Sequence, residues 1–182
     1  MPTFLTGLPL HPLVVHAVVV LVPAAVLGAL VVALWSTARR RWGWPVVVLA
    51  GLAAVSVPLA TSTGEGLEHN LPRTPAIAAH AELGDQLLVF VAPLFVVVLG
   101  LVLVERLRGR PAERADGPGT VVAPRSSRRW IRPAIVVLAV LTVALAAVSA
   151  VQVVRIGDSG ARAAWGDVHY APQPRPAGHR DD

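Results

Sequence analysis

Four long apolar runs constrain this chain more than any other feature of its sequence. They occupy residues 13–35, 45–61, 83–104 and 133–154, and three of them are 22 or 23 residues long. About 20 residues of α-helix cross the hydrocarbon core of a bilayer. With 54% hydrophobic and only 15% charged residues, the chain is also too apolar for an ordinary soluble domain. We therefore predict an all-α fold, a four-helix transmembrane bundle.

The short connection between the first two runs favours an up-down-up-down arrangement in one membrane domain, residues 1–165. Polar residues after the second run, and Thr74-Pro75 before the third, extend these two helices beyond the hydrocarbon core. The segment 106–131 is rich in arginine, proline, glycine and serine, and the tail 166–182 is rich in proline. We predict both to be disordered. The helices are expected at about residues 12–35, 45–69, 75–105 and 133–155.

The chain contains no cysteine, and all 16 of its basic residues are arginines. The absence of cysteine excludes disulfides, thiolate metal sites, cysteine-ligated iron–sulfur clusters and covalently attached haem. A formal net charge of +5 could indicate nucleic-acid binding. The arginines gather near the ends of the apolar runs instead, which indicates membrane orientation, so we expect no nucleic-acid partner.

Eleven of the arginines lie in two segments, one between the first and second helices and one between the third and fourth. By the positive-inside rule these segments are cytoplasmic, and both chain termini are then extracytoplasmic. Tryptophans gather at the same boundary, as in an interfacial aromatic belt. The residues that we expect to set the topology or to face lipid there are Arg39, Arg40, Arg41, Trp42, Trp44, Arg128, Arg129 and Trp130.

The first apolar run is expected to be a retained helix rather than a cleaved signal peptide. A signal peptide has basic residues before a short apolar core. Here residues 1–10 carry no charged side chain, and three arginines follow the run. We therefore predict a multi-pass integral protein of the cytoplasmic (plasma) membrane, which has the lipid bilayer as its first partner.

With this topology, all six histidines fall on the extracytoplasmic side. His16 lies inside the first apolar run, where an ionisable residue is costly and usually functional. His11 comes just before a proline, and we also consider it as the residue that flanks the helix start. His80 is expected near the start of the third helix, Glu65 near the end of the second, and Asp158 just after the fourth.

These five residues are candidate ligands of a metal ion or a haem in the outer half of the bundle. Imidazole and carboxylate suit a transition-metal ion, and two imidazoles suit the iron of haem b. A proton pathway is disfavoured because the cytoplasmic halves of the helices carry almost no polar residues. Simpler interpretations stay open. His80 could belong to a solvated helix end, Glu65 could be an ordinary loop acid, and Asp158 could be the N-cap of a further short helix.

Three short segments stand out: HPLVVH at the first helix, HAELGD at the third, and GDSGARAAW after the fourth. Together they resemble the prokaryotic domain of unknown function 2231 family of small membrane proteins, over about residues 7–165. The resemblance implies a four-helix integral membrane module, sometimes encoded or fused with redox proteins such as Rieske-type domains, with no established activity. It singles out His11, His16, His80 and the turn around Asp158, where relatives often carry histidine.

Two functions follow as hypotheses. The first is an accessory subunit of a membrane redox system, which binds haem or a metal ion through the histidine and carboxylate residues and serves a redox partner protein. The second is a non-catalytic membrane scaffold or partner-binding module without a cofactor. No nucleophile motif of a hydrolytic enzyme occurs in the sequence, so we expect an accessory rather than a catalytic role.

Overall fold

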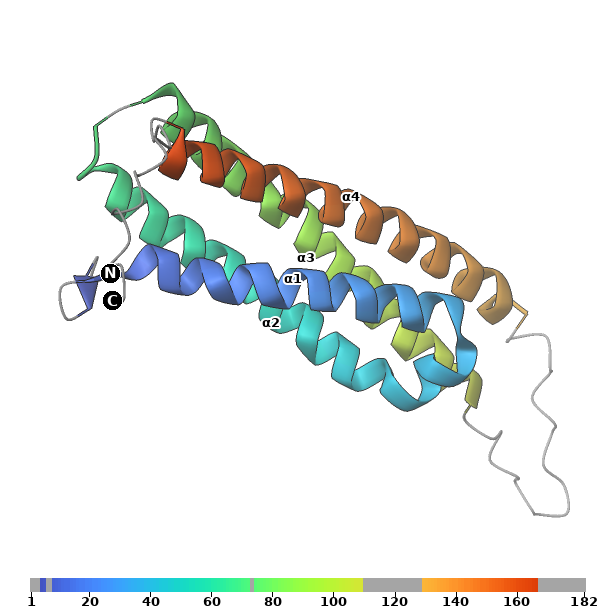
Figure 1. The fold of residues 1–182 in the computed structure, drawn as a ribbon. Helices are drawn as coiled ribbons and strands as arrows, with labels where there is room; N and C mark the ends of the chain where they lie inside the picture. Colours follow the sequence, from blue (N-terminus) through green and yellow to red (C-terminus); the bar gives the residue numbers. More distant parts are fainter. Residues whose placement is uncertain (1–3, 6–7, 73, 110–128, 167–182) are drawn as a thin grey trace, which may run out of the picture.

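Four long helices form a bundle in the computed structural model, which describes residues 4–5, 8–72, 74–109 and 129–166. Neighbouring helices run in opposite directions (Figure 1). All four are long and apolar enough to cross a membrane, so the predicted all-α four-helix transmembrane fold is confirmed. Two short strands, β1 (Phe4–Leu5) and β2 (Leu8–Pro9), pair antiparallel ahead of the first helix. The helices are α1 (Leu10–Leu34), α2 (Ser36–Glu68), α3 (Pro75–Gly109) and α4 (Ile131–Trp165).

The helices are longer than the apolar runs that predicted them. α1 and α2 are separated by Trp35 alone, which has an extended backbone (φ −116°, ψ 113°). The predicted connection at residues 36–44 is therefore the first part of α2. α4 continues to Trp165 instead of ending near residue 155, so Asp158 lies inside a helix and caps none. Hydropathy locates only the segment that lipid surrounds, whereas the flanking arginines and alanines are also good helix formers.

The bundle has two chemically different ends. α2, α3 and α4 contain 33, 35 and 35 residues, which is about 50 Å of helix against a hydrocarbon core of ~30 Å. The helices therefore extend beyond the lipid tails. We call the end with His11 and His80 the histidine end, and the end with Arg39 and Glu105 the arginine end.

The two segments predicted to be disordered lie almost wholly outside the described residues. Residues 110–128 and 167–182 belong to this part of the chain. The described portions of the first segment are residues 106–109, the last turn of α3, and residues 129–131, which lead into the start of α4.

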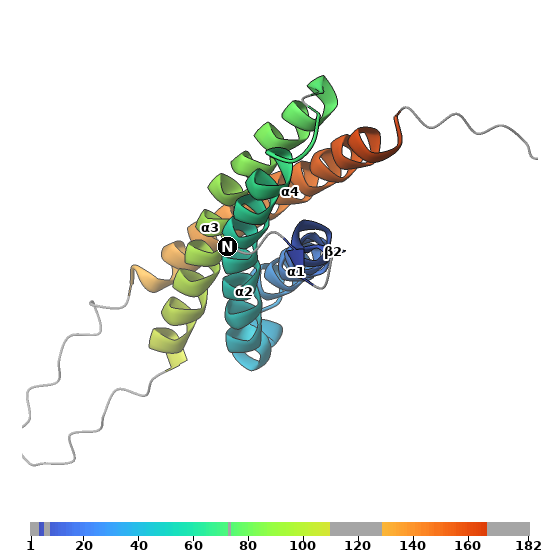
Figure 2. The same ribbon diagram turned by 90° about the vertical axis from the view of Figure 1, so that its left-hand side faces the viewer.

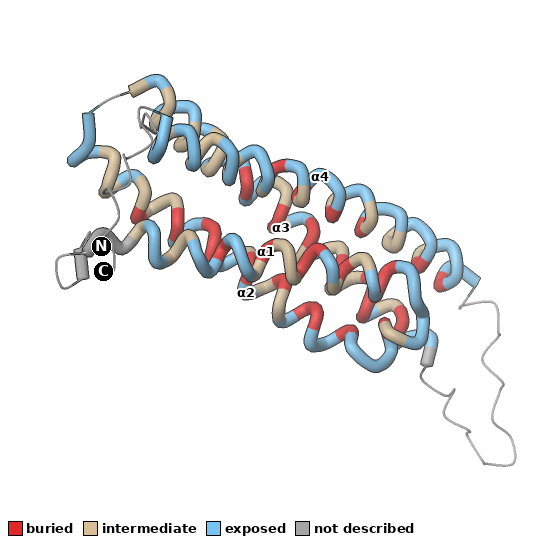
Figure 3. Tube along the Cα trace, in the orientation of Figure 1, coloured by how far each residue is buried: buried red, intermediate tan, exposed pale blue. Residues whose placement is uncertain are grey.

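Small and branched apolar residues fill the interior of the bundle. α1 and α3 each pack on α2 and α4, so α1 and α3 lie diagonally opposite each other. Figure 2, which looks onto the histidine end, shows α2 between them. Figure 3 shows the buried positions facing the bundle axis, among them Val22, Ala53 and Val98. Large exposed side chains on the outside, such as Leu13 and Val89, are also apolar, as contact with lipid requires.

At the arginine end, Arg39 is buried instead of facing lipid as predicted. Its Nε donates a hydrogen bond to Oε2 of Glu105 at 3.1 Å. Its Nη1 donates to the carbonyl oxygens of Val32 and Ala33 at 3.0 and 3.2 Å, which satisfies backbone acceptors in the last turn of α1. The expectation that Arg39 faces lipid was wrong because the chain reverses within one residue, Trp35. The first turn of α2 therefore packs against the last turn of α1.

The other residues predicted to mark this boundary are exposed wherever the structure describes them. Arg40 is largely exposed and places Nη1 3.4 Å from Oε1 of Glu105. Exposed aromatic and basic side chains at one end of a bundle are typical of the interface between lipid and water. These residues are Arg40, Arg41, Trp42, Trp44, Arg129 and Trp130, while Arg128 lies outside the described residues.

Candidate functional site

His11 lies in the first turn of α1, and its ring contacts the end of α2. Its Nδ1 is 3.1 Å from the carbonyl oxygen of Ala60. A carbonyl oxygen can only accept, so Nδ1 carries the proton and donates it. Thr63 places its Oγ1 3.5 Å from the same nitrogen. A Cβ built on Gly64 would lie 2.9 Å from Cε1 of the ring, so the imidazole occupies the space that any side chain at position 64 would need.

His80, in α3, contacts α4 in the same way. Its Nδ1 is 3.0 Å from Oγ of Ser159. The Ser159 hydroxyl donates its own proton to the carbonyl oxygen of Ile156 at 2.9 Å, so it accepts from Nδ1 of the histidine. A Cβ on Gly160 would lie 2.9 Å from Cε1 of the His80 ring, the same value as for the first histidine.

The two arrangements are similar, although Nδ1 donates to a backbone carbonyl in the first and to a serine hydroxyl in the second. We call them the first clasp (His11, Thr63, Gly64) and the second clasp (His80, Ser159, Gly160). In each, a histidine near the start of one helix meets a hydroxyl residue followed by glycine near the end of the next helix. The hydroxyl–glycine pairs were not among the residues predicted from the sequence. A repeat could have revealed them, because AAVS occurs at residues 53–56 of α2 and again at 146–149 of α4, before each pair. The α1–α2 and α3–α4 hairpins thus carry the same features in the same order.

In both clasps, Nε2 of the histidine has no partner among the described residues. With the proton on Nδ1, Nε2 keeps its lone pair. The two rings come from α1 and α3, the diagonal pair of the bundle. The histidine end of the bundle therefore carries two unprotonated imidazole nitrogens, Nε2 of His11 on α1 and Nε2 of His80 on the diagonally opposite α3.

The other three predicted ligands do not join this pair. His16 is exposed on the outside of α1, and its Nδ1 bonds to the carbonyl oxygen of Pro12 in its own helix. Asp158 is exposed on α4 and forms an ion pair with Arg162, Oδ2 to Nη2, at 2.9 Å. Glu65 is exposed on α2. The expected convergence of His16, Glu65 and Asp158 with His80 is not seen.

Helical phase explains this difference. Each residue advances about 100° around a helix. Glu65 is therefore turned away from the position of Gly64, and Asp158 from that of Ser159. His16 is five residues beyond His11, or about 140° around α1, so only one of the two can face inward. Within residues 4–5, 8–72, 74–109 and 129–166, no group of three or more His, Asp or Glu side chains could hold a metal ion.

The inner face of α4 carries further buried polar residues between the second clasp and the middle of the bundle. Gln152 is buried, and its Nε2 donates to the carbonyl oxygen of Leu83 at 3.2 Å. Ser149, one turn deeper, is fully buried, and its hydroxyl has no hydrogen-bond partner among the described residues. The matching serine of the AAVS repeat in α2, Ser56, donates to the carbonyl oxygen of Ala53 at 2.8 Å. The two hairpins are therefore alike but not identical in their interiors.

The fold and the apolar helices define a multi-pass integral membrane protein that contacts the lipid bilayer. Comparison with known proteins then gives the family. The chain matches the family described as predicted membrane protein DUF2231 over residues 7–171, and it belongs to that family. The resemblance noted from its sequence is thereby confirmed. No curated protein and no solved structure matches the chain.

Proposed function

We propose that this membrane protein binds haem b at the histidine end, with Nε2 of His11 and Nε2 of His80 as the two axial ligands. The observation that carries the proposal is that these two imidazole nitrogens, on diagonally opposite helices, have no partner among the described residues. Cofactor sites in helix bundles are built from side chains on facing helices. A haem held by two histidines has no open coordination position and transfers electrons, so the protein would act as an accessory subunit of a membrane redox system.

The number of ligands favours haem over a bare metal ion. A protein-bound transition-metal ion usually needs three or four protein ligands. The described residues offer no group of three. Haem brings four nitrogens of its own and needs only the two axial imidazoles. Of the two cofactors considered from the sequence, haem b therefore suits this pair of histidines better.

The hydrogen bonds at Nδ1 support the same assignment. Histidines that bind metals almost always donate their other ring N–H to a carbonyl or a similar acceptor, which fixes the tautomer and the ring orientation. Ala60 accepts from His11, and Ser159 accepts from His80. Gly64 and Gly160 leave room for the Cε1 edge of each ring to approach the neighbouring helix closely. Both rings are thus oriented before any ligand binds.

The histidine end is proposed to be extracytoplasmic. The support is the charge distribution, since eleven of the sixteen arginines belong to segments at the arginine end, and such segments stay in the cytoplasm. A haem at the histidine end would then lie near the outer surface of the plasma membrane, where it could meet an extracytoplasmic redox partner.

A second candidate function is a scaffold without a cofactor. The observation in its favour is that each clasp already gives its histidine a partner, because the Nδ1 hydrogen bonds join α1 to α2 and α3 to α4. Interhelical hydrogen bonds of this kind stabilise membrane bundles by about 0.6–2 kcal/mol each. The partner surface of such a module would be the exposed polar residues of the histidine end.

A visible spectrum decides between the two candidates. The full chain would be produced with an ample supply of haem, purified in mild detergent, and measured oxidised and reduced. We expect the spectrum of a six-coordinate haem b, which is lost in His11→Ala and in His80→Ala. His16→Ala is the matched control, because this histidine is exposed on the outside of α1, and it should keep the spectrum.

Added imidazole separates ligand loss from misfolding. Free imidazole should restore the six-coordinate spectrum of His80→Ala if only the ligand is missing. A colourless wild-type protein, with His11→Ala and His80→Ala both less stable than wild type, would favour the scaffold and overturn the haem proposal. Equal loss of haem in His16→Ala would also contradict it.

A further inference from the structure

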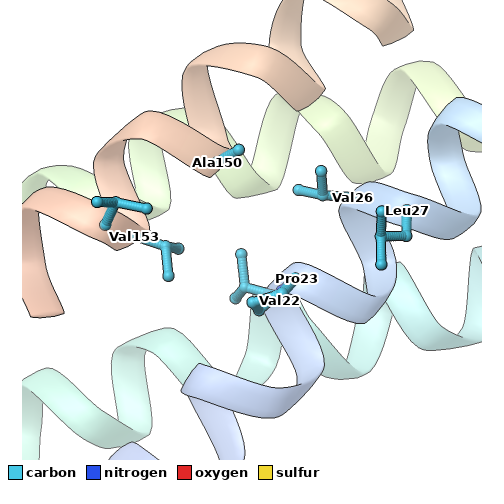
Figure 4. A pocket seen from close by; sticks show the side chains of 7 residues that line it. Val22, Pro23, Val26, Leu27, Ala150 and Val153 are labelled. Carbon is cyan, nitrogen blue, oxygen red and sulfur yellow. The ribbon is translucent and has the colours of Figure 1, made fainter.

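An apolar groove runs along the seam between α1 and α4. It has a volume of about 240 Å³ and is lined by residues from segment 22–27 of α1 and segment 150–154 of α4. Figure 4 shows these side chains facing one another from the two helices. Val22 and Val26 form its buried floor, whereas Leu27 and Val154 are 65% and 71% exposed and form its rims toward the lipid. The groove is therefore open to the bilayer along its length.

Polar residues stand at the end of this groove that points toward the histidine end. His16 lies seven residues before Pro23 and eleven before Leu27, which places it on the same face of α1. Asp158 lies one turn beyond Val154 on α4. Both are exposed. Gly157, which precedes Asp158 on α4, is exposed and has no atom within 4 Å of where a Cβ would be, so the surface beside Asp158 is open.

The groove accounts for the positions of His16 and Asp158, which take no part in the two clasps. Each extends one rim of the groove: His16 follows the line of Leu27 on α1, and Asp158 follows the line of Val154 on α4. An imidazole and a carboxylate at the end of an aliphatic channel, at the level where lipid tails give way to headgroups, are suited to a molecule with a polar head and one long apolar tail.

We infer that the groove binds an isoprenoid quinol of the membrane, with its tail between α1 and α4 and its head at His16 and Asp158. The Nδ1 of His16 bonds to its own helix, which leaves Nε2 as an acceptor for a quinol hydroxyl. The Asp158 carboxylate is a second acceptor there. The site uses none of the residues of the two clasps, so it goes beyond the proposed haem site and does not depend on it.

A phospholipid fits these features less well. A phospholipid carries two acyl chains, whereas the groove is a single channel between two helices. Its phosphate would also meet the carboxylate of Asp158, and the nearby guanidinium of Arg162 is already paired with that carboxylate at 2.9 Å. A quinol head is neutral and donates hydrogen bonds through its two hydroxyls, so this charge-compensated mouth accepts it without repulsion.

The test is the lipid content of the full chain purified from membranes that contain quinols. We expect a stoichiometric amount of quinol in the wild type, recovered as quinone after oxidation in the organic extract. Ala150→Phe fills the groove and should reduce this amount on the order of tenfold. Ala144→Phe is the matched control, because this exposed alanine lies on α4 roughly 120° around the helix from Ala150, and it should retain the quinol.

Two exposed substitutions keep the test independent of folding. His16→Leu and Asp158→Ala should each weaken binding of an added ubiquinol or menaquinol by about tenfold, as expected for the loss of one hydrogen bond to the head. A wild type that carries only phospholipid, or none of either, would overturn the inference. Quinol binding that is equally reduced by Ala144→Phe, or unchanged in Ala150→Phe, His16→Leu and Asp158→Ala alike, would also overturn it.

Discussion

Arg39 and Glu105 form an ion pair that is buried between α2 and α3 at the arginine end of the bundle. The Nε and Oε2 atoms are 3.1 Å apart, and each side chain is only 5% exposed. The same guanidinium holds two carbonyl oxygens of α1. One arginine thereby connects three helices at the end opposite to the two clasps.

Removing one partner of this pair should strongly destabilise the protein. We expect Glu105→Gln or Arg39→Met to lower the free energy of unfolding by about 3–5 kcal/mol, because the remaining charge would be buried without its counter-ion. Denaturant titration in detergent, followed by tryptophan fluorescence, measures this change. Arg40→Ala is the control: this side chain is 55% exposed, so its loss should cost less than about 1 kcal/mol. Equal effects at positions 39 and 40 would contradict a structural role for the buried pair.

The two clasp glycines should not tolerate a side chain. In Gly64→Ala and Gly160→Ala the new methyl group would lie 2.9 Å from the ring of His11 or His80. The ring must then move, and we expect a loss of about 1–3 kcal/mol in unfolding free energy.

Gly157→Ala is the matched control for the clasp glycines. It lies in the same helix as Gly160 and has open space around the added methyl. Alanine is the better helix former, so stability should rise by up to ~1 kcal/mol. The same denaturant titration serves for all three variants, and a loss at position 157 as large as at position 160 would refute the steric explanation.

Ser149→Ala should stabilise the protein by about 1 kcal/mol. The serine hydroxyl is buried without a hydrogen-bond partner among the described residues, and such a group costs free energy that alanine avoids. The comparison is Ser56→Ala, where the hydroxyl is bonded to Ala53 at 2.8 Å and its removal should bring no gain. A destabilised Ser149→Ala would mean that this hydroxyl has a partner in the membrane, such as a bound water.

The orientation can be tested with single cysteines, because the natural chain has none. Glu65→Cys places a thiol at the histidine end, and Arg129→Cys places one at the arginine end. Both positions are exposed. By the positive-inside rule, a membrane-impermeant maleimide should label Glu65→Cys in intact cells and Arg129→Cys only after permeabilisation. The reverse pattern would place the histidine end in the cytoplasm.

The number and position of the helices were predictable from the sequence for a direct physical reason. In a bilayer every backbone N–H and C=O must be bonded within its own segment, so a run of about 20 apolar residues has to be helical. The ends of the helices were less predictable. α2 begins at Ser36, nine residues before the apolar run that revealed it, because helix propensity continues where hydropathy stops.

The tertiary structure alone decided which polar residues face one another. The residue types that suit a haem or metal site were recognisable in the sequence, but hydropathy carries no information about helical phase. His11 faces α2 because Gly64 leaves space for its ring, and His16 then faces the lipid. Ser159 rather than Asp158 meets His80. A glycine in the sequence indicates a histidine contact only when the ring of another helix lies against it, and that depends on how the helices pack.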